Sequence, residues 1–146
     1  MAIGDERESV MKLRVYLVED SAIMSPVTCM SPLLRTLVEA AGARIVGNSG
    51  AAGTAIEDIK VLRPDVVIVD IGLREGTGFD VLKALFHAKD TEAPIRIVLT
   101  SHALEPLRKA AVRLRAAYFF DKSTQIPDMI RVLREMRRPA PAEASR

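Results

Sequence analysis

The sequence predicts a doubly wound α/β domain, in which helices cover both faces of a parallel sheet. Apolar runs of strand length recur five times along the 146 residues, and helical apolar repeats lie between them. Strands that alternate with helices pair in parallel through right-handed crossovers. The third run, residues 66–69, is apolar at every position, which is typical of a strand buried on both sides. We therefore expect it near the centre of the sheet.

Each expected strand is a short run rich in branched or aromatic apolar residues. The second is the shortest and is followed by a stretch containing Gly47, Gly50 and Gly53, which we interpret as a flexible loop. In chain order the expected strands are residues 13–18, 44–46, 65–69, 95–100 and 117–120.

The helices are indicated by apolar residues at spacings of three and four. Examples are Leu34 with Val38, Leu82 with Leu85 and Phe86, and Met129 with Leu133. Residues with capping side chains mark the expected helix starts, either before a proline or at capping-box spacing. These pairs are Ser31 with Pro32, Thr54 with Glu57, and Thr77 with Asp80.

Length and composition favour one domain with an intact core, since 49% of the residues are hydrophobic. The single cysteine excludes an intramolecular disulfide, and no Cys/His cluster offers a zinc site, so a cytoplasmic protein is expected. No apolar run approaches the roughly 18 residues of a membrane helix, which predicts no membrane insertion. We expect residues 1–11 to be a disordered leader, 12–138 the domain, and 139–146 a disordered tail without a following output domain.

The charge is balanced overall at +2 but unevenly distributed. Residues 104–138 carry nine basic and four acidic side chains, whereas the remainder is net negative. The balance argues against direct binding of nucleic acid. The basic region is either a solvated surface or a face for an acidic protein partner, and the sequence leaves both interpretations open.

Polar residues lie at the end of, or directly after, four of the five expected strands. In a doubly wound sheet, ligands bind beyond the carboxyl ends of the strands, so these residues are expected to converge. Clustered carboxylates there favour a divalent cation with oxygen ligands, and an aspartate can accept a phosphoryl group when positive charge neutralises the transferring oxygens. The residues are Glu19 and Asp20 after the first strand, Asp70 after the third, Thr100 at the end of the fourth, and Lys122 after the fifth.

The order and spacing of these residues resemble the receiver domains of two-component response regulators. The matching segments are Val15–Ser21, Val66–Asp70, Val98–Ser101 and Phe119–Lys122, and the resemblance extends over about residues 12–138. It implies a flavodoxin-like sheet of order 2-1-3-4-5, which a chemotaxis member of the family also has.

The resemblance also implies roles for individual residues. Asp70 would be phosphorylated by a sensor histidine kinase or a histidine phosphotransferase, in a reaction that needs Mg²⁺ or Mn²⁺. Asp20 would bind the metal directly, Glu19 mainly through water, and Gly72 through its carbonyl. Thr100 and Lys122 would contact the phosphoryl group, and Phe119 occupies the position of the family's aromatic switch residue. Gly78 matches a family glycine.

We therefore expect a stand-alone response regulator, a phosphoacceptor switch rather than an enzyme, that changes protein contacts or relays phosphate. One alternative is a degenerate receiver that binds partners without phosphorylation. Another is a phosphatase of the haloacid dehalogenase type, which the reading Asp70-Ile71-Gly72 disfavours because that family needs Asp-x-Asp. The chain departs from the family pattern at Arg74, where a proline is usual, and in residues 22–30, which we interpret as a lengthened loop beside the metal site.

Overall fold

The computed structural model describes residues 12–19, 31–87 and 93–136. The expected leader, the tail and the lengthened loop at 22–30 lie outside this part of the chain. Within it, no helix has both the length and the apolar character that crossing a membrane requires. The strands are β1 (Leu13–Val18), β2 (Ala43–Ser49), β3 (Val66–Val69), β4 (Ile95–Thr100) and β5 (Tyr118–Asp121).

A helix follows or precedes each strand in the described part, as the alternating pattern predicts. Thr77 caps one of them: its hydroxyl accepts from Asp80 N at 3.3 Å, and the Asp80 carboxylate accepts from Thr77 N at 3.0 Å. This confirms the predicted capping box. The helices are α2 (Ser31–Ala40), α3 (Ala52–Leu62), α4 (Gly78–Phe86), α5 (Glu105–Arg113) and α6 (Ile126–Met136).

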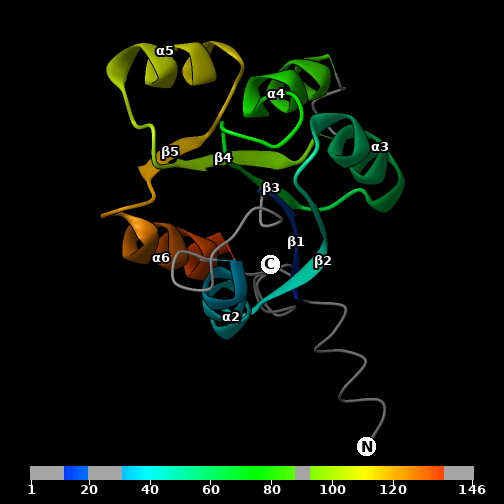
Figure 1. Cartoon of the computed structure of the whole chain (residues 1–146). Coiled ribbons are helices and arrows are strands. Elements are labelled where there is room, and N and C mark those ends of the chain that lie inside the picture. The colour runs from blue at the N-terminus through cyan, green and yellow to red at the C-terminus, as the bar shows by residue number, and fades with distance from the viewer. Residues whose placement is uncertain (1–11, 20–30, 88–92, 137–146) are drawn as a thin grey trace, which may run out of the picture.

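The five strands form one parallel sheet in the order β2-β1-β3-β4-β5, which confirms both the predicted fold class and the central position of β3 (Figure 1). Residues that directly follow the strands extend the ladder across their neighbours. Glu19 N donates to Ser49 O at 2.9 Å and Asp70 N donates to Val18 O at 2.8 Å. The carboxyl ends of β1, β2 and β3 therefore lie at one level.

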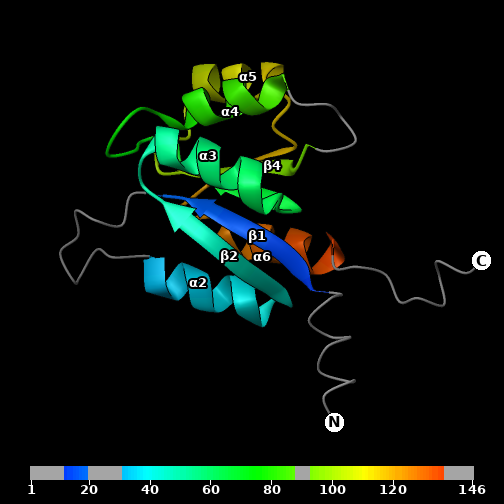
Figure 2. The same ribbon diagram turned by 90° about the vertical axis from the view of Figure 1, so that its right-hand side faces the viewer.

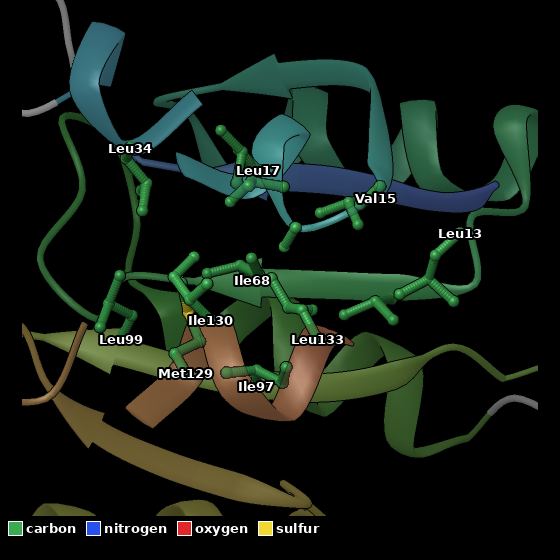
Figure 3. Close-up of a cluster of buried hydrophobic side chains, with 14 of the residues drawn as sticks. Leu13, Val15, Leu17, Leu34, Ile68, Ile97, Leu99, Met129, Ile130 and Leu133 are labelled. Carbon is green, nitrogen blue, oxygen red and sulfur yellow. The ribbon is translucent and has the colours of Figure 1, made fainter. Parts of the chain in front are cut away.

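Helices cover both faces of the sheet. Figures 1 and 2 show α3, α4 and α5 on one face and α2 and α6 on the other. Along β3, Val67 and Val69 pack under the first group, while Val66 and Ile68 pack under the second. Figure 3 shows the second core, in which Leu34 of α2 and Leu133 of α6 enclose side chains of the sheet. All four β3 side chains are buried, which explains the unbroken apolar run.

The strand β2 is longer than the predicted 44–46 and contains Gly47, which we had interpreted as part of a loop. The pairing with β1 shifts after Ile45, so that Gly47 lies opposite Tyr16. A Cβ on Gly47 would lie 2.9 Å from Tyr16 Cε2, so the glycine provides space for the fully buried phenol ring. The Tyr16 hydroxyl donates to Asp58 Oδ2 at 2.7 Å, which links β1 to α3.

The predicted capping role of Thr54 is wrong. With Thr54 as the cap the helix would begin at Ala55, but α3 begins three residues earlier, at Ala52, and its cap residue Ala51 makes no side-chain cap bond. Ala52 N instead donates to the Glu75 backbone carbonyl at 2.9 Å. Because a tertiary contact satisfies this end of the helix, the local capping signal at Thr54 and Glu57 was misleading. The boundaries of β1 and β4 agree with prediction, β3 begins one residue later than predicted, and β5 is shifted by one residue at both ends.

Candidate phosphoacceptor site

Three of the predicted charged residues meet at the carboxyl ends of the strands. Lys122 Nζ lies 2.7 Å from Asp70 Oδ2 and 3.4 Å from Glu19 Oε1. The side chains are 16%, 13% and 9% exposed respectively, so one ammonium is shared between two largely desolvated carboxylates. These three residues follow β5, β3 and β1, and only the parallel sheet brings them together.

The pKa of Lys122 reflects this environment. Burial by itself would lower the pKa of the amine, because it disfavours the charged form. The hydrogen bond and charge of Asp70, with those of Glu19, outweigh burial and raise the pKa above its usual value. Lys122 is therefore a permanent cation at neutral pH.

The loop after β3 holds the Asp70 carboxylate and its backbone in place. Gly72 N donates to Asp70 Oδ1 at 3.2 Å, and Gly78 N donates to the Ile71 carbonyl at 2.9 Å. A Cβ on Gly78 would lie 2.5 Å from the Asp70 carbonyl oxygen. The start of α4 thus packs directly against the backbone that carries Asp70, which explains the glycine at this position.

Thr100 ends β4 beside this cluster and is completely buried. Its hydroxyl accepts from His102 N at 3.1 Å. Its backbone carbonyl accepts from Lys122 N at 2.9 Å, so the ends of β4 and β5 are joined next to the candidate site. The imidazole of His102 lies near Gly72: a Cβ on Gly72 would be 3.8 Å from His102 Nε2.

Phe119 is buried in the core formed with α3, α4 and α5, being 7% exposed. The guanidinium of Arg108, from α5, lies 4.8 Å from the centre of its ring, a cation–π contact. Phe119 is therefore a core residue in this conformation. Its role as a switch residue stays a prediction.

The predicted metal ligand Asp20 lies outside the described residues. Among those that are described, no group of three or more His, Cys, Asp or Glu side chains is arranged to hold a metal ion. Glu19 and Asp70 nevertheless form a carboxylate pair that a single ammonium leaves with one excess negative charge. Oxygen ligands with excess negative charge suit Mg²⁺ or Mn²⁺, so the donor set fits such an ion.

Sequence reasoning did not identify the turn that carries Lys122. Asp121 Oδ1 accepts from Ser123 N at 2.8 Å and from Ser123 Oγ at 2.6 Å, and Asp121 N donates to Gln125 Oε1 at 2.8 Å. These two donations from Ser123 lower the pKa of the Asp121 carboxyl, against a small opposing effect of burial. The available signal was an Asp-x-Ser segment, which favours a side-chain turn.

A five-stranded parallel sheet of order 2-1-3-4-5, with a lysine and acidic residues at the strand ends, defines a receiver-type α/β domain. Comparison with models of known families gives the same class of domain. The model of the response regulator receiver domain matches residues 15–134. The chain belongs to this family of two-component signalling proteins.

Known proteins similar to this chain include chemotaxis protein CheY of Thermotoga maritima, 28% identical over 126 residues, which are 86% of this chain and 98% of that protein. Protein-glutamate methylesterase/protein-glutamine glutaminase 5 of Myxococcus xanthus is 35% identical over 107 residues, 73% of this chain and 28% of that protein. Its match thus covers a minor part of the larger enzyme.

Solved structures show the same fold at lower identity. The receiver domain of the sensor histidine kinase PA1611 from Pseudomonas aeruginosa, described with magnesium in its active-site cleft, has a TM-score of 0.68 and 18% identity over 85% of this chain and 96% of that one. A chain of the CheX–CheY complex from Borrelia burgdorferi, described with BeF3 and magnesium, has a TM-score of 0.72 and 19% identity over 89% of this chain and 91% of that one.

Proposed function

We propose that this chain is a stand-alone response regulator that accepts a phosphoryl group on Asp70 from a phosphohistidine donor. The donor would be a sensor histidine kinase or a histidine phosphotransferase. The reaction would take place in the cytoplasm. Membership of the receiver family supports this proposal, as does similarity to a chemotaxis protein along almost that protein's whole length. The product would be an aspartyl phosphate that changes protein contacts or passes the phosphate on.

The observation that carries the proposal is the 2.7 Å contact of Lys122 Nζ with Asp70 Oδ2. Phosphoryl transfer places negative charge on the transferring oxygens, and a cation fixed beside the acceptor stabilises that charge without reorganisation. Lys122 is already held there and is ionised, so the ammonium is preorganised. In the unphosphorylated chain it neutralises the acceptor, and after transfer it can bind the phosphoryl group.

The proposed metal is Mg²⁺ or Mn²⁺, with ligands from Asp70, Glu19, Asp20 and the Gly72 carbonyl. When bound, such an ion supplies further positive charge at the phosphoryl oxygens. Glu19 and Asp70 together exceed the charge of Lys122, which favours recruitment of a cation. The description of magnesium in the related Pseudomonas receiver supports the same assignment.

Thr100 and Phe119 are the proposed response elements. The Thr100 hydroxyl lies at the end of the strand next to β3 and can donate to a phosphoryl oxygen, an interaction that the bare carboxylate does not require. Phe119 lies one strand further along, beneath Arg108. Phosphorylation would shift a pre-existing equilibrium of these side chains and of the surface above them.

The surface around β5 is the proposed contact face for an acidic protein partner. Figure 1 shows α5 and α6 on opposite faces of the sheet, both beside the edge strand β5. Lys109 and Arg113 of α5 and Arg131 and Arg134 of α6 are exposed. Opposite charge on a partner would speed encounter and fix its orientation.

This contact face can be tested by replacing Arg131 and Arg134, together with Arg137, which lies outside the described residues, with glutamine. Binding to polyglutamate should weaken, and its dependence on salt should decrease, because fewer charges take part. The control replaces the exposed Lys60 and Lys83, on α3 and α4, and should bind as the wild type does. Unchanged binding of the triple variant at every ionic strength would exclude an acidic partner on this face.

Phosphorylation itself is tested with acetyl phosphate and Mg²⁺. The wild-type chain should gain one phosphoryl group by intact mass, and Asp70→Asn should gain none. The matched control Asp128→Asn removes an exposed carboxylate of α6 and should be modified normally. Equal labelling of the Asp70 variant would show that another residue is the acceptor.

The same experiment separates the alternatives. A degenerate receiver would show neither phosphodonor reactivity nor Mg²⁺ binding, yet would still bind its partner. A phosphatase of the haloacid dehalogenase type would turn over a phosphomonoester many times, for which a second aspartate would be needed as general acid. Ile71-Gly72 supplies no such group after Asp70.

A further inference from the structure

The position of Lys122 Nζ depends on the backbone at residue 122, which the sheet fixes from one side. Lys122 directly follows the edge strand β5, which pairs with β4 alone. Its backbone N–H donates to Thr100 O at 2.9 Å, and four flexible side-chain torsions then separate this anchor from the ammonium. A lysine side chain has much conformational freedom to lose. Fixing the backbone on both sides of residue 122 therefore improves the placement of the charge.

Asp121 and Gln125 supply the second anchor. The Asp121 carboxylate passes over Lys122 to accept both donors of Ser123, so that Lys122 is the middle residue of a side-chain turn. The Asp121 carbonyl accepts from Thr124 N at 3.2 Å and from Gln125 N at 2.7 Å. Gln125 Oε1 in turn accepts from Asp121 N at 2.8 Å, which closes the link between β5 and α6.

These bonds differ from those of a helix cap. A capping side chain accepts from N–H groups in the first turn of its helix. Here the Gln125 side chain extends back to the end of β5, and the Asp121 carboxylate accepts from Ser123 in the link between β5 and α6. The two side-chain acceptors thus bond to residues on either side of Lys122.

We propose that Asp121 and Gln125 are positioning residues that hold the turn around Lys122 and so present its ammonium to Asp70. This inference rests on the proposed function, because its consequence is a faster phosphoryl transfer. The two residues act through Lys122 and do not touch the acceptor. Their contribution should therefore disappear when the lysine is absent.

The test measures the rate of Asp70 phosphorylation by acetyl phosphate in excess Mg²⁺, over a range of donor concentrations. Asp121→Ala should lower the maximal rate about tenfold, with little change in the half-saturating donor concentration, because a charged hydrogen-bond acceptor is lost. Asp121→Asn keeps an acceptor oxygen and should restore most of the rate. Gln125→Ala should lower the rate less, and Gln125→Glu should recover it.

A double-mutant cycle tests whether the effect passes through the lysine. In a Lys122→Ala background, Asp121→Ala should cause no further decrease beyond about twofold. An equal tenfold decrease in both backgrounds would overturn the inference, as would a wild-type rate for Asp121→Ala. Thermal melts identify loss of folding, and if Asp121→Ala does not fold, the Gln125 pair is measured in the same cycle. A wild-type chain that gains no phosphate would instead overturn the proposed function.

Discussion

Two glycine-to-alanine substitutions should change stability in opposite directions. At Gly78, the first residue of α4, an added Cβ would lie 2.5 Å from the Asp70 carbonyl oxygen, 2.7 Å from Val69 Cγ1 and 2.9 Å from Ile71 Cα. Two of these atoms belong to the backbone and cannot move by rotating a side chain. At Gly53 in α3, no atom outside its own helix turn or chain neighbours lies within 4 Å of the added Cβ.

The expected magnitudes follow from these contacts. Overpacking a rigid region costs about 1–3 kcal/mol, and the backbone contacts place Gly78→Ala near 3 kcal/mol of lost unfolding free energy. Gly53→Ala should gain about 0.5–1 kcal/mol, because alanine restricts the unfolded chain and favours helix. For a domain of this size the melting temperature should fall by roughly 8 °C and rise by roughly 2 °C, respectively.

Urea unfolding followed by circular dichroism measures both changes, with the m-value expected to stay constant. Phosphorylation of Gly78→Ala by acetyl phosphate should also slow, since the clash displaces the backbone of Asp70, the proposed acceptor, whereas Gly53→Ala should react at the wild-type rate. A Gly78→Ala chain as stable as the wild type would refute the described approach of α4 to β3. The expected gain in stability of Gly53→Ala, measured in the same series, would show that the assay resolves changes of this size.

Three further changes address Tyr16, Thr100 and the helix caps. Burial, with the hydrogen bond and charge of Asp58, raises the pKa of Tyr16; the folded phenol then keeps its proton when the unfolded one loses it, so stability should decrease as the pH rises above about 10. Tyr16→Phe should lose about 1 kcal/mol at pH 8 and show a smaller decrease toward pH 11 in urea titrations. Thr100→Val should lose about 1 kcal/mol of unfolding free energy, because the hydrogen bond of the hydroxyl is lost. Phosphorylation should then no longer shift the NMR signal of the residue 100 amide, whereas Thr100→Ser should respond like the wild type. Thr77→Ala should lose about 1 kcal/mol by thermal melting and Thr54→Ala none, and equal losses would contradict the assigned start of α3.

The sequence was sufficient to predict the sheet, because its main signals are periodic and local. The all-apolar run at 66–69 indicated a central strand, and the capping pair Thr77 and Asp80 located the start of α4 correctly. The convergence of Glu19, Asp70 and Lys122 was also predictable, since parallel strands bring their carboxyl ends to one edge. The ion pairs among these three side chains follow directly from that arrangement.

Features that depend on tertiary contacts were not predictable. The Ala52 N–H is satisfied by a carbonyl in the loop after β3, which no local pattern near Thr54 records. Gly47 belongs to β2 and provides space for the Tyr16 ring on the neighbouring strand, instead of forming part of a loop. The role of Asp121 required knowledge of which donors lie within reach of its carboxylate, and in the sequence it counted only as one acidic residue in a basic region.

The hydrogen bond from Lys122 N to Thr100 O has a mechanical consequence. It joins the backbones of the two residues proposed to contact the phosphoryl group at opposite sides, so neither strand end can be displaced without pulling on the other. A response to phosphate would then travel as one concerted shift of the β4–β5 pair instead of two separate adjustments. A spectroscopic reporter on the end of β4 and one on the end of β5 should therefore record the same relaxation time. The proposed contact face around β5 would change in the same single step.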